Sequence, residues 1–262
     1  MDEGIYIAAA GGIKQQRKLD LISNNLANLN NVGFKKDQAM FQALLTPFKE
    51  DLGFEASRAA TLPPTKSNET VSYVGISGFS TDHSQGTLLN TQNPLDLALD
   101  GEGYFAIQTP AGIRYTRKGD FRLDAENRLV TQNGHPVLTE KGGPLVLEIS
   151  GKAVDIDANG TVTVGAGLEN TSLGKLRVVD FADKSKLMKE GDGLFRAIDP
   201  KAEKPAQNAS VRQGFLENSN VNSVGEMSKM VETLRTFEAY QKVIQSIDHI
   251  NTESANTIGR VV

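Results

Sequence analysis

The chain has 262 residues, of which 39% are hydrophobic, and its 28 basic and 32 acidic side chains leave a formal net charge of -4. This length allows one large domain or two smaller ones, and the charge gives no basic field for nucleic acid. The sequence contains no cysteine, which excludes thiolate catalysis, zinc–thiolate sites and disulfides.

Neither a membrane span nor a secretory signal is predicted. The best apolar run, Ile5 to Ile13, is far too short to cross a bilayer. The chain begins with Met1-Asp2-Glu3, which is acidic where a signal peptide would be basic. We therefore expect a protein that stays in the cytosol or leaves by a route that does not read such a signal.

The first predicted element is a helix from Gly4 to about Leu29. Apolar or small residues fall at the a and d positions of one heptad frame, with Gln15 as the exception. The small residues at 8–12 would let a partner helix approach closely, although Gly11 and Gly12 cost helix stability. The frame consists of Ile5, Ala8, Gly12, Leu19, Ile22, Leu26 and Leu29.

An asparagine-rich stretch follows, with five Asn between positions 24 and 31. Asn30, Asn31 and Gly33 tolerate left-handed backbone, so the helix should end there. Two interpretations remain open. The amides belong to a solvated helix end, or they hydrogen-bond to neighbouring chains, where several donors and acceptors can be satisfied at once.

Residues 37–79 show no clear period. Phe41, Leu44 and Leu45 suggest a short helix, which Pro47 and then the pair at 63–64 would break. We expect an extended arm that packs on a neighbour, or a free surface loop.

From about residue 71 to residue 216 the hydrophobic period changes from helical to strand-like. Turn sequences recur every 8–12 residues or so, which is typical of an antiparallel β sandwich or barrel. Strands are predicted at Leu95–Leu99, Tyr104–Ile107, Leu145–Ile149, Thr161–Val164 and Lys175–Asp180.

The last predicted element is a long helix from about Asn220 to Ile258. Ser223 and Glu226 form a possible capping box, with Asn220 as the alternative cap. Apolar residues form one seam with steps of three and four, and a second line opens on a neighbouring face, which indicates more than one packing partner. The seam is Met227, Met230, Leu234, Phe237 and Ile244; the second line is Val243, Ile247 and Ile250. Because both ends of the chain carry a seam, we expect them to pair, the alternative being a helix that lies across its own domain.

No motif predicts catalysis, a cofactor or a metal site. Residues 155–160 (DIDANG) match the first half of a calcium loop, but its twelfth position is Ala166 instead of Glu, so a plain turn at Asn159-Gly160 is expected. The three histidines, at positions 83, 135 and 249, lack metal-ligand spacing.

Several motifs resemble those of one family, the bacterial flagellar rod and hook proteins. Residues 24–28 (NNLAN) with 33–35 (GFK) look like its N-terminal signature, and residues 214–221 (GFLENSNV) look like its C-terminal one. Residues 100–105 (DGEGYF) followed by 115–119 (YTRKG) resemble its central domain. Within the family, the ends of the chain look most like the proximal rod protein and next most like the distal one, whereas the hook protein commonly has a larger middle.

The resemblance implies a non-enzymatic axial subunit of the flagellar basal-body rod. It implies an α+β fold, in which paired, coiled-coil-like terminal helices (1–36 and 214–262) flank an arm (37–79) and a central antiparallel β sandwich or barrel (80–213). Its partners would be copies of itself, other rod and axial proteins and the flagellar type III export apparatus, and its place would be the periplasmic rod. The alternatives are a distal rod or hook-type protein, a rod-associated wall hydrolase and a ligand-binding β module.

The predicted assembly interface contains no catalytic, cofactor or metal residue. It consists of Ile5, Leu19, Ile22, Asn24, Asn25, Leu26, Asn28, Leu29, Gly33, Phe34, Met227, Met230, Leu234, Phe237, Ile244 and Ile247.

Overall fold

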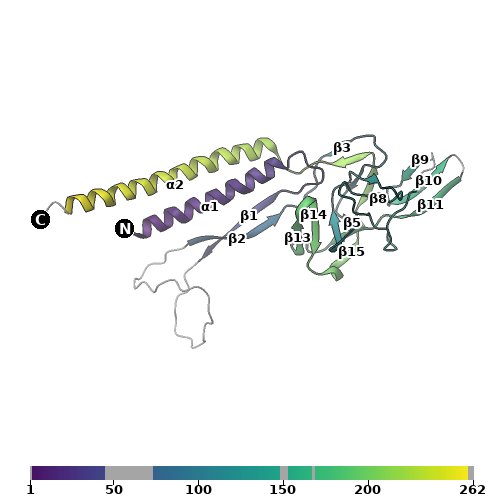
Figure 1. Cartoon of the computed structure of the whole chain (residues 1–262), viewed down its shortest axis with the longest axis horizontal. Helices are drawn as coiled ribbons and strands as arrows, with labels where there is room; N and C mark the ends of the chain where they lie inside the picture. Colours follow the sequence, from purple (N-terminus) through teal and green to yellow (C-terminus); the bar gives the residue numbers. More distant parts are fainter. Residues whose placement is uncertain (1, 45–72, 148–152, 167–168, 259–262) are drawn as a thin grey trace, which may run out of the picture. The chain divides into compact units, whose positions relative to one another are not determined.

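The computed structural model describes residues 2–44, 73–147, 153–166 and 169–258. Helix α1 (Asp2–Ala27) and helix α2 (Ser223–Ile258) stand at the two ends of the chain, and antiparallel strands fill the middle (Figure 1). The expected α+β class is therefore confirmed. Two compact units form: one comprises Met1–Leu21, Ala39–Phe79 and Lys229–Val262, and the other comprises Ile22–Gln38 and Ser80–Ser228.

The largest sheet of the second unit has six strands in the order β13-β14-β6-β5-β12-β15. Their bounds are β5 Tyr104–Thr109, β6 Gly112–Thr116, β12 Val178–Phe181, β13 Leu187–Glu190, β14 Leu194–Ala197 and β15 Glu203–Pro205. Single-turn 3-10 helices at Lys184–Lys186, Gly191–Gly193 and Pro200–Ala202 lie between the later strands.

Smaller sheets complete the β region. A three-stranded sheet contains β9 (Ala153–Ile156), β10 (Thr161–Ala166) and β11 (Glu169–Lys175), and three strand pairs accompany it. The pairs are β16 (Ser210–Gln213) with β4 (Leu97–Asp100), β17 (Phe215–Glu217) with β3 (Leu88–Asn90), and β7 (Arg122–Leu123) with β8 (Leu129–Val130).

The six-stranded sheet is buried on both faces. In β5, Phe105 and Ile107 belong to one apolar cluster, whereas Tyr104 and Ala106 belong to another. Alternate residues of a strand point to opposite faces, so each face of the sheet carries its own core. This explains why the predicted strand at Tyr104–Ile107 is continuously apolar.

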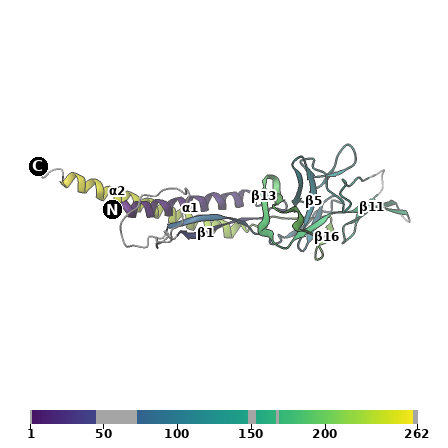
Figure 2. The ribbon, with the colours of Figure 1, turned by 90° about the horizontal axis from the view of Figure 1, so that it is seen from below.

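Two predictions about local structure need correction. The short helix suggested around Phe41 is wrong: that segment is strand β1 (Asp37–Leu44), which pairs with β2 (Tyr73–Thr81) and lies beside it in both views (Figures 1 and 2). A short isolated helix is costly to nucleate, whereas pairing with β2 satisfies the backbone at once. The remainder of the predicted arm, residues 45–72, lies outside the described residues.

The prediction of a strand at Leu145–Ile149 also needs correction, because its described residues do not form a regular strand. Val146 makes an isolated bridge to Arg128 while the side chains of Leu145 and Leu147 are buried, and residues 148–149 lie outside the described part of the chain. The N–H of Leu129 donates to the carbonyl of Leu145, and the N–H of Leu147 donates to the carbonyl of Asn127. These are single backbone hydrogen bonds, not a continuous ladder. The segment therefore contributes to the core through its side chains.

Candidate assembly interface

The two terminal helices pair within the first unit through the small residues of α1. A β-carbon added to Gly11 would lie 2.4 Å from Cε1 of Tyr240, and one added to Gly4 would lie 3.6 Å from Cδ1 of Ile247. The ring of Tyr240 therefore occupies the space that a side chain at position 11 would need. The expected close approach at the small residues is present, and both views show the helices side by side (Figures 1 and 2).

Helix α2 begins at Ser223, so its cap lies between the two predicted caps, Asn220 and Ser223. Oδ1 of Asn222 accepts the N–H of Gly225 at 2.9 Å, and the carbonyl of Asn222 accepts the N–H of Glu226. Asn222 is therefore the N-cap, as its residue type favours. The predicted cap Asn220 instead bridges two segments: it accepts the N–H of Lys36 and donates to the carbonyl of Asp82.

The predicted seam of α2 divides between two faces. Three of its residues, spaced seven apart, are half-buried on the side toward α1, where Phe237 lies 4.0 Å from the β-carbon position of Gly12: Met230, Phe237 and Ile244. Ile247, from the predicted second line, is also half-buried. Met227 and Leu234 are instead 53% and 42% exposed. Together with the exposed Val224 and Val231 they are spaced three and four residues apart, so these four side chains line one face of the helix. We call this face the α2 stripe.

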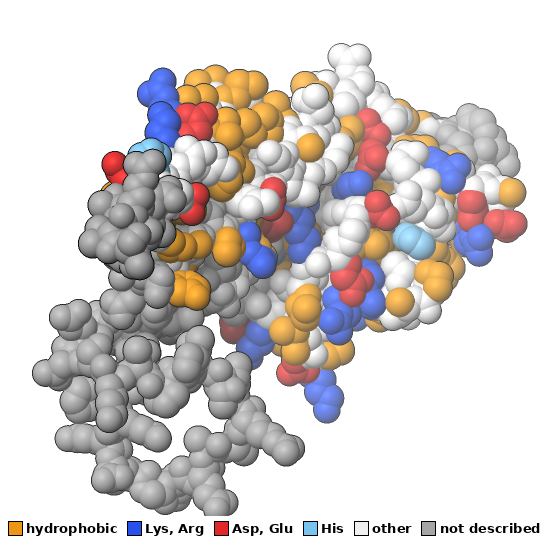
Figure 3. All heavy atoms as spheres, turned by 60° about the vertical axis from the view of Figure 1, so that its left-hand side comes forward, with side chains coloured by type: hydrophobic (Ala, Val, Ile, Leu, Met, Phe, Trp, Pro, Cys, Tyr) orange, Lys and Arg blue, Asp and Glu red, His pale blue; other side chains and the backbone are white. Residues whose placement is uncertain are grey.

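The predicted residues of α1 are also distributed between burial and exposure. Ile22 is buried, whereas Ile5, Leu19 and Leu26 are half-buried. Apolar residues outside the prediction are exposed on the same helix, namely Tyr6, Ile7 and Ile13. The space-filling view shows apolar side chains gathered where the helices lie (Figure 3). Leu29, just after the helix, is half-buried.

The asparagine amides bond largely within the chain. Asn25 is buried and pairs with the backbone of Asp37 in both directions, donating to its carbonyl and accepting its N–H at 3.0 Å each. The amide of Asn28 donates to the carbonyl of Asn24, and Asn31 donates to Oδ1 of Asn28. Asn25 thus extends the pairing of β1, a solution that neither interpretation of the sequence included. Contacts of Asn24 and Asn28 with neighbouring chains stay a prediction.

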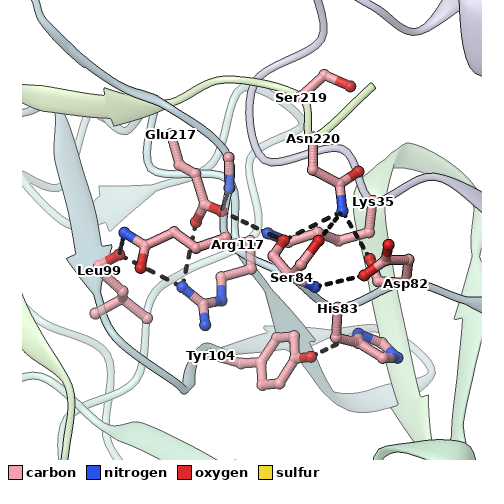
Figure 4. Close-up of polar contacts among 12 residues, drawn as sticks. Lys35, Asp82, His83, Ser84, Leu99, Tyr104, Arg117, Glu217, Ser219 and Asn220 are labelled. Carbon is pink, nitrogen blue, oxygen red and sulfur yellow. Dashed lines mark hydrogen bonds and ion pairs between the residues drawn. The ribbon is translucent and has the colours of Figure 1, made fainter. Parts of the chain in front are cut away.

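A buried ionic cluster lies just beyond these amides. Nζ of Lys35 pairs with Oε1 of Glu217 and donates to the carbonyl of Ser84 at 2.7 Å (Figure 4). Nη1 of Arg117 donates to Oε2 of the same carboxylate at 3.2 Å, and Nη2 donates to the carbonyl of Gly101 at 2.7 Å. The side chains of Lys35 and Glu217 are 0% exposed, and that of Arg117 is 3% exposed.

The cluster was missed as a site by sequence reasoning, although its members were quoted. Lys35, Arg117 and Glu217 stand in the N-terminal, central and C-terminal motifs. Burial lowers the pKa of Lys35, while the charge and hydrogen bond of Glu217 oppose that shift. The signal that could have revealed it is the presence of charges of opposite sign in three motifs that lie far apart in the chain: Lys35, Arg117 and Glu217.

The predicted residues Gly33 and Phe34 support the same region. The N–H of Gly33 donates to the carbonyl of Glu217, and its φ of 65° is favourable for glycine. The buried ring of Phe34 is covered by the ammonium of Lys189, 3.9 Å from the ring centroid. That ammonium also donates to the carbonyl of Lys35. Both residues therefore pack inside the second unit.

A histidine and a tyrosine lie beside the cluster. Tyr104 Oη is 2.7 Å from Nδ1 of His83. Burial, and then the nearby cations Lys184, Lys35 and Arg117, lower the pKa of His83 to about 4. The imidazole is therefore neutral near pH 7, and it shares one hydrogen bond with the hydroxyl.

In the turn at residues 157–160, the carboxylate of Asp157 is hydrogen-bonded to nearby backbone N–H groups. Oδ1 of Asp157 accepts the N–H groups of Asn159 at 2.9 Å and Thr161 at 2.7 Å, and these bonds lower the pKa of the carboxyl. The expected Asn159-Gly160 turn between β9 and β10 is confirmed. In the described part of the chain, no group of three or more potential metal ligands converges, and no helix is long and apolar enough to span a membrane.

The terminal helices pair, apolar helix faces are exposed, and buried polar groups serve packing. These features are typical of a protein with a structural role. Three family models match in order: "Flagella basal body rod protein" at residues 5–35, "Flagellar hook protein FlgE/F/G D1 domain" at 98–164, and "Flagellar basal body rod FlgEFG protein C-terminal" at 212–257. Each model covers one of the regions whose motifs carry the resemblance.

Full-length relatives agree with these matches. The chain is 31% identical to the flagellar basal-body rod protein FlgF of Caulobacter vibrioides over 100% of both chains. It is 33% identical to FlgG of Bacillus subtilis over 98% of this chain and 99% of that one, and 32% identical to FlgG of Agrobacterium fabrum over 94% and 95%.

The chain belongs to the flagellar basal-body rod protein family. It is a proximal-rod-like member and a structural subunit, not an enzyme, as the motifs predicted.

Proposed function

We propose that this chain joins the rod through its terminal helices and that the α2 stripe contacts a neighbouring subunit. The observation that carries the proposal is the exposure of Val224, Met227, Val231 and Leu234 along one face of α2. A contiguous apolar face of this kind marks an interaction site in soluble proteins. Within the first unit a neighbouring face of α2 contacts α1, so one helix serves two partners.

The finer assignments rest on the resemblance and on family membership. The terminal segments 1–36 and 214–262 form a coiled-coil-like assembly domain, and residues 80–213 form a sandwich-like or barrel-like domain. Contact between Gly11 and Tyr240 supports the helix pairing, and the two apolar clusters of the large sheet support a layered β domain. Partners are copies of the chain and other rod proteins in the periplasmic basal body, reached through the type III export apparatus without a cleaved signal.

Replacing Leu234 by aspartate tests the proposal. Leu234 is 42% exposed in the single chain, so Leu234→Asp should leave the melting of the sheets of the second unit, which we call the β unit, unchanged. In an assembled rod the same carboxylate would enter a dry interface, at a cost of several kcal/mol per subunit. We expect normal levels of soluble protein, no incorporation into purified basal bodies, and non-motile cells when the variant replaces the native copy.

The exposed Ser228 provides a matched control. It lies six residues before Leu234, about 120° around the helix from that side chain, so Ser228→Asp adds the same charge to a polar position outside the α2 stripe. We expect this variant to assemble. Normal motility with Leu234→Asp would refute the proposed contact, and equal failure of both variants would show that any added charge is harmful. Hydrolysis of purified peptidoglycan by the chain would instead favour the wall-hydrolase alternative.

A further inference from the structure

Each of the three motifs that carry the family resemblance contributes one charged side chain to the same buried cluster inside the second unit. Lys35 closes the N-terminal motif, Arg117 lies in the central one and Glu217 lies in the C-terminal one, and the first and the last are 182 positions apart in the sequence. Their charged groups contact one another directly (Figure 4). Motifs so far apart in the chain therefore share one structural element.

Burial excludes these three side chains from direct contact with another subunit. The side chains of Lys35 and Glu217 have no exposed surface, and Arg117 has almost none. A partner that recognised the motifs through these charges would first have to open the unit. The charges must therefore act within the chain.

The carboxylate of Glu217 is the centre of the cluster. It receives Lys35 and Arg117 and also accepts the N–H of Gly86 at 2.8 Å. Nζ of Lys35 also donates to the carbonyl of Ser84, and Nη2 of Arg117 donates to that of Gly101, whereas the buried Nε of Arg117 has no hydrogen-bond partner among the described residues. Two positive charges thus depend on one negative charge, so loss of Glu217 leaves two buried cations, whereas loss of Lys35 leaves one balanced pair.

Backbone contacts tie the chain on either side of this cluster to the β unit. The N–H of Gly33 donates to the carbonyl of Glu217, and the N–H of Asn220 donates to the carbonyl of Phe34. The amide of Asn220 also donates to the carbonyls of Asp82 and Ser84. Residues 22–38 contain the end of α1 and the chain after it, and residues 217–228 contain the start of α2 and the chain before it; we call these two segments the helix roots.

We propose that Lys35, Arg117 and Glu217 form a latch whose role is to hold the two helix roots together on the β unit, which makes the three residues positioning residues for assembly. The latch deepens the proposed function, because the two segments that it joins contain the ends of the helices through which the chain is proposed to assemble. The family motifs that contain these residues then serve the geometry of the subunit, and the exposed helix faces serve contact between subunits.

Hydrogen exchange of the full-length monomer tests the latch without any assembly step. In Glu217→Gln we expect amides of both helix roots to exchange about tenfold faster or more, while β5 and β6 keep their protection. Lys35→Met should have a smaller effect on the same amides. Asp100→Asn, which removes a half-exposed ion pair with Arg212 in the same unit, is the control and should leave the helix roots unchanged.

A second substitution distinguishes a charge latch from ordinary packing and covers the case in which Glu217→Gln fails to fold. Adding Lys35→Met to Glu217→Gln leaves one buried cation instead of two, so the double variant should regain protection of the helix roots. No such rescue, an unchanged exchange rate in Glu217→Gln, or a larger effect of Lys35→Met would overturn the latch. Because these measurements use the monomer, they can fail while Leu234→Asp still abolishes assembly, and the reverse also holds.

Discussion

Gly33 provides a sharp test of how tightly the N-terminal motif is packed. Its φ of 65° lies in the left-handed region, and an added β-carbon would lie 2.6 Å from the carbonyl carbon of Arg117 and from the nitrogen of Lys118. That separation is about 0.8 Å short of the 3.4 Å at which ordinary contact begins. Since both contacted atoms belong to the backbone, relief requires the chain at Arg117 to move.

Two effects contribute to the free energy of unfolding of Gly33→Ala. An alanine held in the left-handed region costs about 1–2 kcal/mol. Displacing packed backbone adds about 2–3 kcal/mol, so we expect a total loss of about 3–5 kcal/mol. Gly134 isolates the first effect, because it has φ 82° and no heavy atom within 4 Å of its β-carbon position. Gly134→Ala should therefore cost only about 1–2 kcal/mol.

Urea unfolding of both variants, followed by circular dichroism of the β unit, measures the difference. Gly33→Ala should unfold at clearly lower urea than Gly134→Ala, with a similar dependence on denaturant. Equal losses in the two variants would show that the contact with Arg117 contributes nothing and that backbone conformation alone matters at Gly33. A Gly33→Ala chain as stable as the unmodified protein would refute the argument altogether.

Two further predictions concern the helix pair and the buried histidine. Gly11→Ala should weaken the pairing of α1 with α2, because its β-carbon would lie 2.4 Å from the ring of Tyr240. Gly12→Ala, with nothing closer than 4.0 Å to its β-carbon, should instead gain about 1 kcal/mol of helix propensity. Thiol crosslinking in chains that also carry Gly4→Cys and Ile247→Cys would detect the difference, and equal crosslinking of the two variants would contradict it. His83 has its pKa lowered from 6.5 to about 4, so the unfolded chain binds more protons between these values. The free energy of unfolding should thus be fully retained above pH 6.5 and fall by about 1–2 kcal/mol toward pH 4, after allowance for partial exposure of the ring. His83→Gln should remove this fall in the free energy of unfolding. If the urea midpoint of His83→Gln depended on pH as that of the unmodified protein does, the assignment would be contradicted.

The asparagine-rich stretch shows where sequence reasoning reached its limit. Composition and the glycine at position 33 correctly indicated that the helix ends there, because both are local backbone preferences. The partner of each amide could not be inferred, since Asn25 bonds to Asp37 only after the chain has turned back on itself. Periodicity and residue size likewise indicated the close approach of α2 to the small residues of α1, but not that Met227 and Leu234 of the predicted seam are exposed.

The sequence by itself determined the α+β class, the two terminal helices, several strands and, through three motifs, membership of the rod family. These features depend on local propensity, hydrophobic period and residue identity, all of which are readable along the chain. The tertiary structure alone decided that β1 is a strand, that Met227 and Leu234 are exposed while Phe237 faces α1, and that Lys35 meets Glu217. Each of those depends on a partner distant in the sequence, whose position is set only when the backbone hydrogen bonds and buried charges of the whole unit are satisfied together.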